Sequence, residues 1–283
     1  MSRPIASPHR SLLHAACFTN PVTIEVIALL LACGLAAGLL AGLLGIGGGL
    51  VVVPVVTWLL LAEGASQDLA VPMAVATSLA SMLLTSASAI FSHHRLGGMD
   101  AAAIGRLAPT VAAGAVLGAW IALAIPGATL ARVFAAVAAI IGLRMLLAVR
   151  PAVADRPAFP RGWWSLGPVI GAISALVGIG GGSFNVPYLA RNGYTMARAV
   201  AIASACGYPI ALAGAVSFVL LGWGRTDWPA TLGWVWWPGM VLIGMGGMVA
   251  APWGARLAHR LPAGVLRRTF GVFLILVALR MAW

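Results

Sequence analysis

The sequence predicts an all-α polytopic membrane protein of about eight to ten membrane segments, built from two repeats that are each interrupted by glycines. Hydrophobic residues make up 61% of the chain and charged residues only 8%. Soluble domains carry roughly 25% charged residues, so we expect the chain to lie in a lipid bilayer. Apolar stretches without a charged residue cover residues 26–62, 70–92, 107–130, 133–143, 162–190, 199–224, 228–255 and 269–279.

The connections between these stretches are short, and their composition excludes several functions. They leave no room for a soluble catalytic domain, and the apolar stretches bring together no His, Asp or Glu groups, so we expect no enzyme. The basic residues are all arginines scattered over the connections, which is typical of topology determinants and not of a nucleic-acid surface. Cys17, Cys33 and Cys206 lack metal-binding spacing. We therefore expect neither a metal nor another cofactor.

A glycine motif of the form G-I-G-G-G-x-x-x-V-P occurs twice, at residues 45–54 and 178–187. Further residues of the first half recur at a constant distance in the second: Gly118, Pro126, Leu130, Arg132, Phe134, Arg144 and Met145 match Gly254, Pro262, Leu266, Arg268, Phe270, Arg280 and Met281. These matches predict two copies of one unit, 22–149 and 163–283. An N-terminal arm, 1–21, precedes them, and a polar linker, 150–162, joins them.

The distribution of charge predicts how the two repeats are oriented. The linker is rich in arginine and the loop from His93 to Arg106 is basic, so both are expected in the cytoplasm. The Glu63–Asp68 loop is acidic and is expected outside. The predicted crossings are 70–92, 107–125 and 130–149 in the first repeat and 199–221, 233–253 and 266–283 in the second. The two repeats then run in opposite directions. Such inverted repeats are typical of secondary transporters, and we expect a multi-pass protein of the cell inner membrane.

The first segment of each repeat is predicted to be a helix, a break and a half-helix that turns back or continues across the membrane. Gly45 suits a left-handed helix C-terminus. Pro54 and Pro187 favour the first position of a helix, so we expect them to open the half-helices. Residues 45–53 and 178–186 would then be non-helical backbone at membrane depth, which is tolerated where it is buried in protein or lines a cavity.

Free N–H groups and the positive dipole at the start of each half-helix favour a small anion. No charged residue lies deep in a predicted span, whereas a cation transporter would be expected to carry a carboxylate there. We therefore expect the substrate to bind between the two broken segments. The candidate binding residues are Gly45, Gly47, Gly48, Gly49 and Pro54 in the first break; Gly178, Gly180, Gly181, Gly182, Ser183, Asn185 and Pro187 in the second; and Thr77, Ser78, Ser81 and Ser204 in the helices that follow.

Other interpretations of the same pattern remain open at this point. Glycine clusters in membrane helices are also typical of close helix packing. The same features fit a permease for another small organic anion, an anion channel, or a subunit that transports nothing itself. The oligomeric state does not follow from the sequence.

The doubled glycine motif, the run Ala74-Val75-Ala76-Thr77-Ser78, the pattern Arg95-x-Gly97-x-x-Asp100 and the ending from Pro262 to Met281 resemble the TauE/SafE family of sulfite and organosulfonate exporters. The resemblance covers almost the whole chain. It implies secondary transport of small sulfur-containing anions, sulfite or sulfonates such as sulfoacetate, usually outward and linked to protons. It also implies that both glycine motifs form the substrate region. The second half departs from the pattern at Ala203, which stands where the first half has Thr77.

Overall fold

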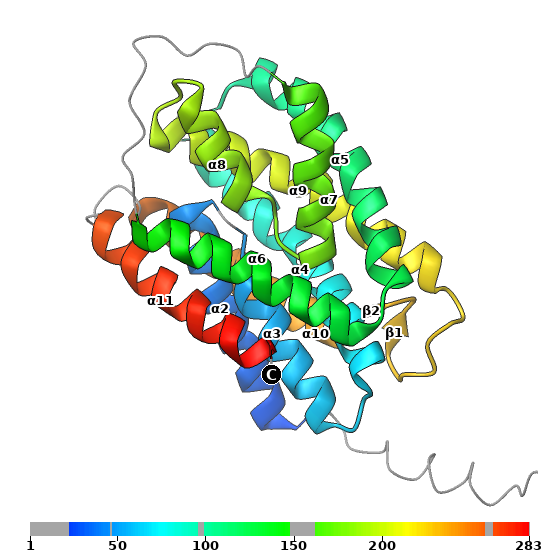
Figure 1. Cartoon of the computed structure of the whole chain (residues 1–283). Coiled ribbons are helices and arrows are strands. Elements are labelled where there is room, and N and C mark those ends of the chain that lie inside the picture. The colour runs from blue at the N-terminus through cyan, green and yellow to red at the C-terminus, as the bar shows by residue number, and fades with distance from the viewer. Residues whose placement is uncertain (1–22, 46, 96–98, 148–161, 258–262, 283) are drawn as a thin grey trace, which may run out of the picture.

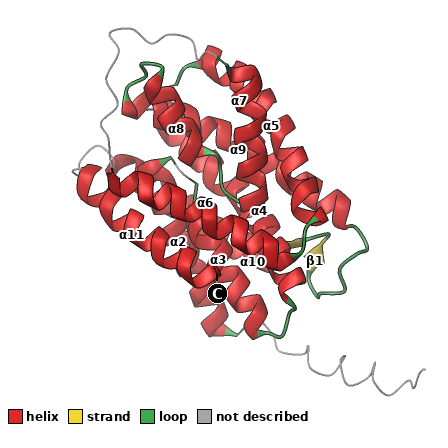
Figure 2. Ribbon diagram, viewed as in Figure 1, coloured by secondary structure: helices red, strands yellow, loops and turns green. Residues whose placement is uncertain are grey.

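The computed structural model describes residues 23–45, 47–95, 99–147, 162–257 and 263–282. The predicted arm at 1–21 and nearly all of the linker at 150–162 lie outside these residues. Almost everything described is helical (Figure 2). The helices are α2 Ile24–Leu44, α3 Gly49–Ala62, α4 Gln67–Arg95, α5 Ala101–Ala124, α6 Gly127–Leu147, α7 Trp163–Val177, α8 Gly182–Arg191, α9 Met196–Gly222, α10 Trp237–Leu257 and α11 Ala263–Ala282, with a small hairpin of β1 Thr231–Leu232 and β2 Val235–Trp236.

Six of the described helices are long and apolar enough to cross a membrane: α2, α4, α5, α6, α9 and α10. Their outward faces carry large apolar side chains, among them Leu117 and Trp120 on α5 and Val249 and Trp253 on α10. A soluble protein rarely exposes apolar patches of this kind, whereas a bilayer favours them. The structure therefore confirms the predicted class, an all-α polytopic membrane protein.

The two halves contain the same series of helices, and helices of one half pack on helices of the other. Helix α2 of the first half packs on α10 of the second, and α7 of the second half packs on α5 of the first. Figure 1 shows α5 and α7 side by side. The matched helices α4 and α9 contact each other, as do α6 and α11. This packing is what a two-fold relation between the halves would produce. The direction of each half relative to the membrane stays a prediction.

Polar side chains at the helix ends fix the connections. Asp100 caps α5 by accepting hydrogen bonds from the N–H groups of Ala102 and Ala103, both at 3.1 Å, and its other carboxylate oxygen accepts the hydroxyl of Tyr194 at 3.1 Å. Asp68, at the start of α4, accepts the N–H of Gly127 at the start of α6 at 2.6 Å. The bonds from Tyr194 to Asp100 and from Gly127 to Asp68 join helix ends and loops that are far apart in the sequence.

The predicted break is confirmed, but its extent was predicted wrongly. Helix α2 ends at Gly45 with φ 66° and α7 ends at Gly178 with φ 73°, both left-handed. The next helices begin at Gly49 and Gly182, so Pro54 and Pro187 lie inside α3 and α8 and do not open them. An internal proline costs about 3 kcal/mol. Away from water, each backbone N–H or C=O group without a hydrogen bond costs several kcal/mol, and helical backbone that starts at Gly49 and Gly182 pairs these groups.

The predicted crossing at 233–253 also starts too early. Residues 231–236 form the β1–β2 hairpin, and α10 begins only at Trp237. The N–H of Trp234 donates to the carbonyl of Phe218 at 3.3 Å, and that of Trp236 donates to the hydroxyl of Thr77 at 3.0 Å. Because these backbone groups find partners on α9 and α4, the segment needs no helix to satisfy them.

Candidate functional site

The two glycine breaks lie against each other in the centre of the protein. A Cβ atom at Gly47 would stand 2.9 Å from the backbone nitrogen of Gly180. A Cβ atom at Gly49 would collide with the carbonyl oxygen of Gly178. Only glycine allows two backbones to approach this closely. The motif is therefore repeated because each copy provides the surface on which the other packs.

Helix α4 supports the second break through Ser78. The hydroxyl of Ser78 donates to the carbonyl of Gly178 at 2.9 Å. Two other predicted hydroxyls on this helix also bond within the protein: Ser81 donates to the carbonyl of Ser78 at 2.8 Å, and Thr77 accepts the N–H of Trp236. The structure thus gives Thr77, Ser78 and Ser81 structural hydrogen bonds.

A cluster of polar side chains surrounds the start of α8. A Cβ atom built at Gly181, which caps α8 with φ 72°, would lie 3.3 Å from Asn185 Nδ2 and 3.4 Å from Ser174 Oγ. Asn185 and Ser174 are completely buried. Ser183, in the first turn of the same helix, is partly buried. We call Ser174, Ser183 and Asn185 the polar cluster.

The polar cluster makes no side-chain hydrogen bond that would satisfy it. Ser174 Oγ, Ser183 Oγ and both polar atoms of the Asn185 amide are buried without a partner. Thr57 Oγ1 on α3 and Ser204 Oγ on α9 are in the same state. The N–H groups of Gly182 and Ser183 belong to the first turn of α8 and have no carbonyl within the helix to bond. Ser174 and Asn185 therefore leave unsatisfied donors and acceptors beside the N-terminal cap of α8, and Ser183 adds a hydroxyl in the first turn of that helix.

The matched positions of the first break, all of them among the described residues, carry no polar side chain. Aligning the two glycine motifs places Ala41 opposite Ser174, Leu50 opposite Ser183 and Val52 opposite Asn185. All three first-half residues are buried and apolar. Sequence reasoning named Ser183 and Asn185 but missed Ser174, which lies upstream of the motif on α7. Aligning the two halves could have identified Ser174, because the matched position in the first half is the apolar Ala41.

The helices that carry the polar cluster and the helix after it have few charged side chains. In the described parts of α7, α8 and α9 the charged residues are Arg191 and Arg198, and both are exposed. No group of three or more His, Cys, Asp or Glu side chains that could hold a metal occurs in the described part of the chain. A ligand here would meet N–H groups, hydroxyls and an amide.

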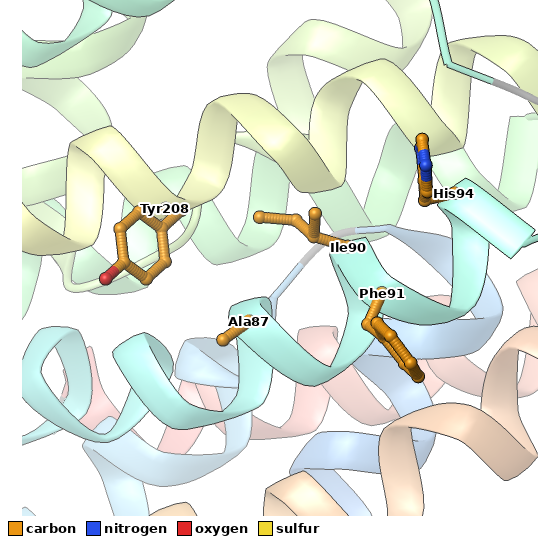
Figure 3. A pocket seen from close by; sticks show the side chains of 5 residues that line it. All are labelled: Ala87, Ile90, Phe91, His94 and Tyr208. Atoms are coloured by element: carbon orange, nitrogen blue, oxygen red, sulfur yellow. The ribbon is translucent and has the colours of Figure 1, made fainter.

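A surface hollow of about 400 Å³ lies between α4 and α9. Figure 3 shows its lining: Ala87, Ile90, Phe91 and His94 along α4, and Tyr208 on α9. Gly207, beside Tyr208, faces the second break, because a Cβ atom there would lie 2.9 Å from the carbonyl oxygen of Gly180. Gly207 therefore contacts the second glycine break, while its neighbour Tyr208 lines the hollow.

A family model described as sulfite exporter TauE/SafE matches residues 30–281. The chain belongs to this family. It is also 32% identical over 257 residues to a probable membrane transporter protein of Haemophilus influenzae, covering 90% of this chain and 97% of that protein. No solved structure matches the chain. With its apolar helices, this family membership identifies a multi-pass membrane transporter that acts on a small molecule.

Proposed function

We propose that the protein is a secondary transporter of small sulfur-containing anions, sulfite or sulfonates, in the cell inner membrane, and that the second glycine break binds the anion. The observation that carries this proposal is the polar cluster. Its side chains are buried without partners at positions where the first half of the same chain has apolar residues.

The cost of the polar cluster argues for a ligand. Each buried polar group without a hydrogen bond costs about 1–3 kcal/mol. The first half forms the same succession of helix, glycine break and helix with Ala41, Leu50 and Val52 and avoids this cost. Since the fold does not require polar groups here, we attribute them to a substrate that supplies the missing hydrogen bonds while it is bound.

The chemistry of the cluster favours an anion. The first N–H groups of α8 and its dipole attract negative charge, and the hydroxyls of Ser174 and Ser183 add donors. A cation would find neither a carboxylate nor another negative side chain on α7, α8 or α9 in their described residues. The family description supports a sulfur oxyanion as the cargo.

The arrangement of helices supports an alternating-access mechanism. Because α2 packs on α10 and α7 on α5, each of these pairs joins helices from both halves. We propose that the two halves are inverted in the membrane and that these pairs rock around the touching glycine breaks. The hollow beside Gly207 and Tyr208 would then be the route from one side of the membrane.

Flux measurements in liposomes test the proposal. Purified protein would be assayed with sulfite, taurine, sulfoacetate and acetate, with and without a proton gradient. We expect saturable flux of at least one sulfur anion, which Asn185→Val lowers about tenfold or more because it removes donor and acceptor together. Asn192→Ala is the matched control: this asparagine caps α8 at its other end, where its amide donates to the carbonyl of Tyr188 at 2.8 Å.

The alternatives give different results in the same assay. Ionic conductance without saturation would indicate an anion channel, and flux of acetate alone would indicate a permease for another organic anion. Equal flux in wild type and Asn185→Val, with both proteins folded, would contradict the assignment of the site.

A further inference from the structure

We infer that the substrate of the polar cluster is a singly charged oxyanion that brings its own hydrogen-bond donor, such as hydrogen sulfite or a hydroxyalkanesulfonate. This inference rests on the proposed function and narrows its substrate class. The observation behind it is that Asn185 is buried with both ends of its amide unsatisfied.

Both ends of the Asn185 amide are satisfied only by a ligand that has a hydrogen-bond acceptor and a hydrogen-bond donor. It presents two N–H donors at one end and a carbonyl acceptor at the other, whichever way the amide is turned. The oxygens of any sulfur oxyanion can accept from the amide N–H groups, from the serine hydroxyls and from the start of α8. The amide oxygen of Asn185 cannot bond to these ligand oxygens, because both are acceptors and two electron-rich oxygens repel each other. A hydrogen on the ligand turns this repulsion into a hydrogen bond.

The charges around the cluster limit the ligand to one negative charge. Arg191 and Arg198 on α8 and α9 are exposed, and α7 carries no charged side chain in its described residues. None of the three atoms nearest to a Cβ atom built at Gly181 belongs to a titratable or charged group. The other such groups on α8, on α9 and on the helices packed against them are Tyr188, Cys206, Tyr208, Asp68, His93, His94, Arg95 and Arg106. The dipole of a helix end balances about half a charge. A second negative charge in this buried place would have no counter-charge.

A single proton on the ligand supplies the hydrogen-bond donor and also reduces the charge of the ligand to one. Protonation of sulfite to hydrogen sulfite removes one negative charge and creates an O–H donor for the Asn185 amide oxygen. The proton then crosses the membrane on the substrate. Transport is linked to protons in this way without an ionisable side chain in the polar cluster.

Comparing two sulfonates of nearly equal size tests whether the ligand needs a hydrogen-bond donor in addition to its negative charge. Methanesulfonate and hydroxymethanesulfonate each carry one negative charge and differ by a hydroxyl group. In proteoliposomes we expect the KM of hydroxymethanesulfonate to be about tenfold lower than that of methanesulfonate, since losing one buried hydrogen bond has an effect of this size. Sulfoacetate, with two charges, should show little flux. Asn185→Val should abolish the preference for the hydroxyl group, and Asn192→Ala should retain it.

The outcomes distinguish this inference from the proposed function. Equal KM values for the two sulfonates, with flux that still depends on Asn185, would overturn the inference and leave the anion site in place. A preference that survives in Asn185→Val would also overturn it, because the donor would then be recognised elsewhere. Rapid flux of sulfoacetate would overturn the single-charge requirement. Absence of flux for sulfite and both sulfonates in folded protein would overturn the proposed function and the inference with it.

Discussion

The two glycine breaks share one motif but differ in the side chains that follow it. In the first break, Leu50 and Val52 are buried among apolar neighbours; in the second, Ser183 and Asn185 take their places. The backbones also differ, because Gly48 has φ −75° whereas Gly181 has φ 72°. The comparison teaches that the glycines and the polar residues have separate tasks. The glycines let the two breaks touch, and we assign substrate binding to the polar residues of the second.

The largest effect is expected where the two breaks touch. Gly49→Ala places a methyl group against the carbonyl oxygen of Gly178, which is backbone and cannot move aside. We expect flux at background level and a clearly lower melting temperature. Gly105→Ala on α5 is the control, because a Cβ atom there meets nothing within 4 Å; it should leave both properties near wild type. Wild-type flux in Gly49→Ala would show that the breaks need not pack so closely.

Making the first break polar should damage stability without improving transport. Val52→Asn introduces an amide at a position that is 1% exposed and has apolar neighbours. We expect the free energy of unfolding to fall by about 1–3 kcal/mol, measured by thermal or denaturant unfolding in detergent, with no gain in affinity for sulfite. A tighter KM in this variant would mean that the first break also binds substrate.

Making the second break less polar should have the opposite effect on stability. Ser174→Ala removes a buried hydroxyl that has no partner. We expect the melting temperature to stay the same or rise, while the KM for sulfite increases several-fold, because functional sites commonly trade stability for activity. Ser217→Ala, whose hydroxyl donates to the carbonyl of Ala213 on its own helix, is the serine control. A fall in stability with unchanged KM would assign Ser174 a structural role.

The matched serines on α4 and α9 offer a smaller test. Ser78 donates to the carbonyl of Gly178, whereas Ser204, its counterpart, has no partner. We expect Ser78→Ala to lower the free energy of unfolding by about 1 kcal/mol and Ser204→Ala to leave it unchanged. Equal losses in unfolding experiments would contradict the asymmetry between the two halves.

The smallest effect is expected at the loop after α8. Tyr194 donates to Asp100 there, and its counterpart after α3 is Ala65. Tyr194→Phe should cost about 1 kcal/mol of unfolding free energy at neutral pH. Burial, then the hydrogen bond to Asp100, raise the pKa of Tyr194 above its usual 10.0. The stabilising contribution is therefore present below the usual pKa and is lost only as the pH rises through the raised value, so unfolding of the two proteins should converge in strong alkali.

Much of the fold could be predicted from the sequence because its signals are local. Long apolar stretches predicted where most of the long helices lie, although α5 begins at Ala101 and not at residue 107, and Gly45 and Gly178 marked the ends of α2 and α7. The starts of α3 and α8 could not be predicted, because pairing of the backbone groups before Pro54 and Pro187 outweighed the local preference of proline. The β1–β2 hairpin was missed since its backbone bonds reach Phe218 and Thr77, which are distant in the sequence.

The candidate site could be predicted only in part, because a sequence does not show which hydroxyls are already bonded. Ser81 donates to its own helix, whereas Ser174 has no partner. No local pattern separates these two serines. Their difference comes from how α7, α8 and α9 pack, and the aligned repeat is the sequence feature that reflects it.

The most direct test of the central claim is to give the second break the side chains of the first. The triple variant Ser174→Ala, Ser183→Leu and Asn185→Val copies Ala41, Leu50 and Val52. Calorimetric titration of the purified protein with sulfite would measure the Kd of wild type and of this variant. We predict no detectable binding in the variant, with a melting temperature at least equal to that of wild type. An unchanged Kd in the folded variant would contradict the account.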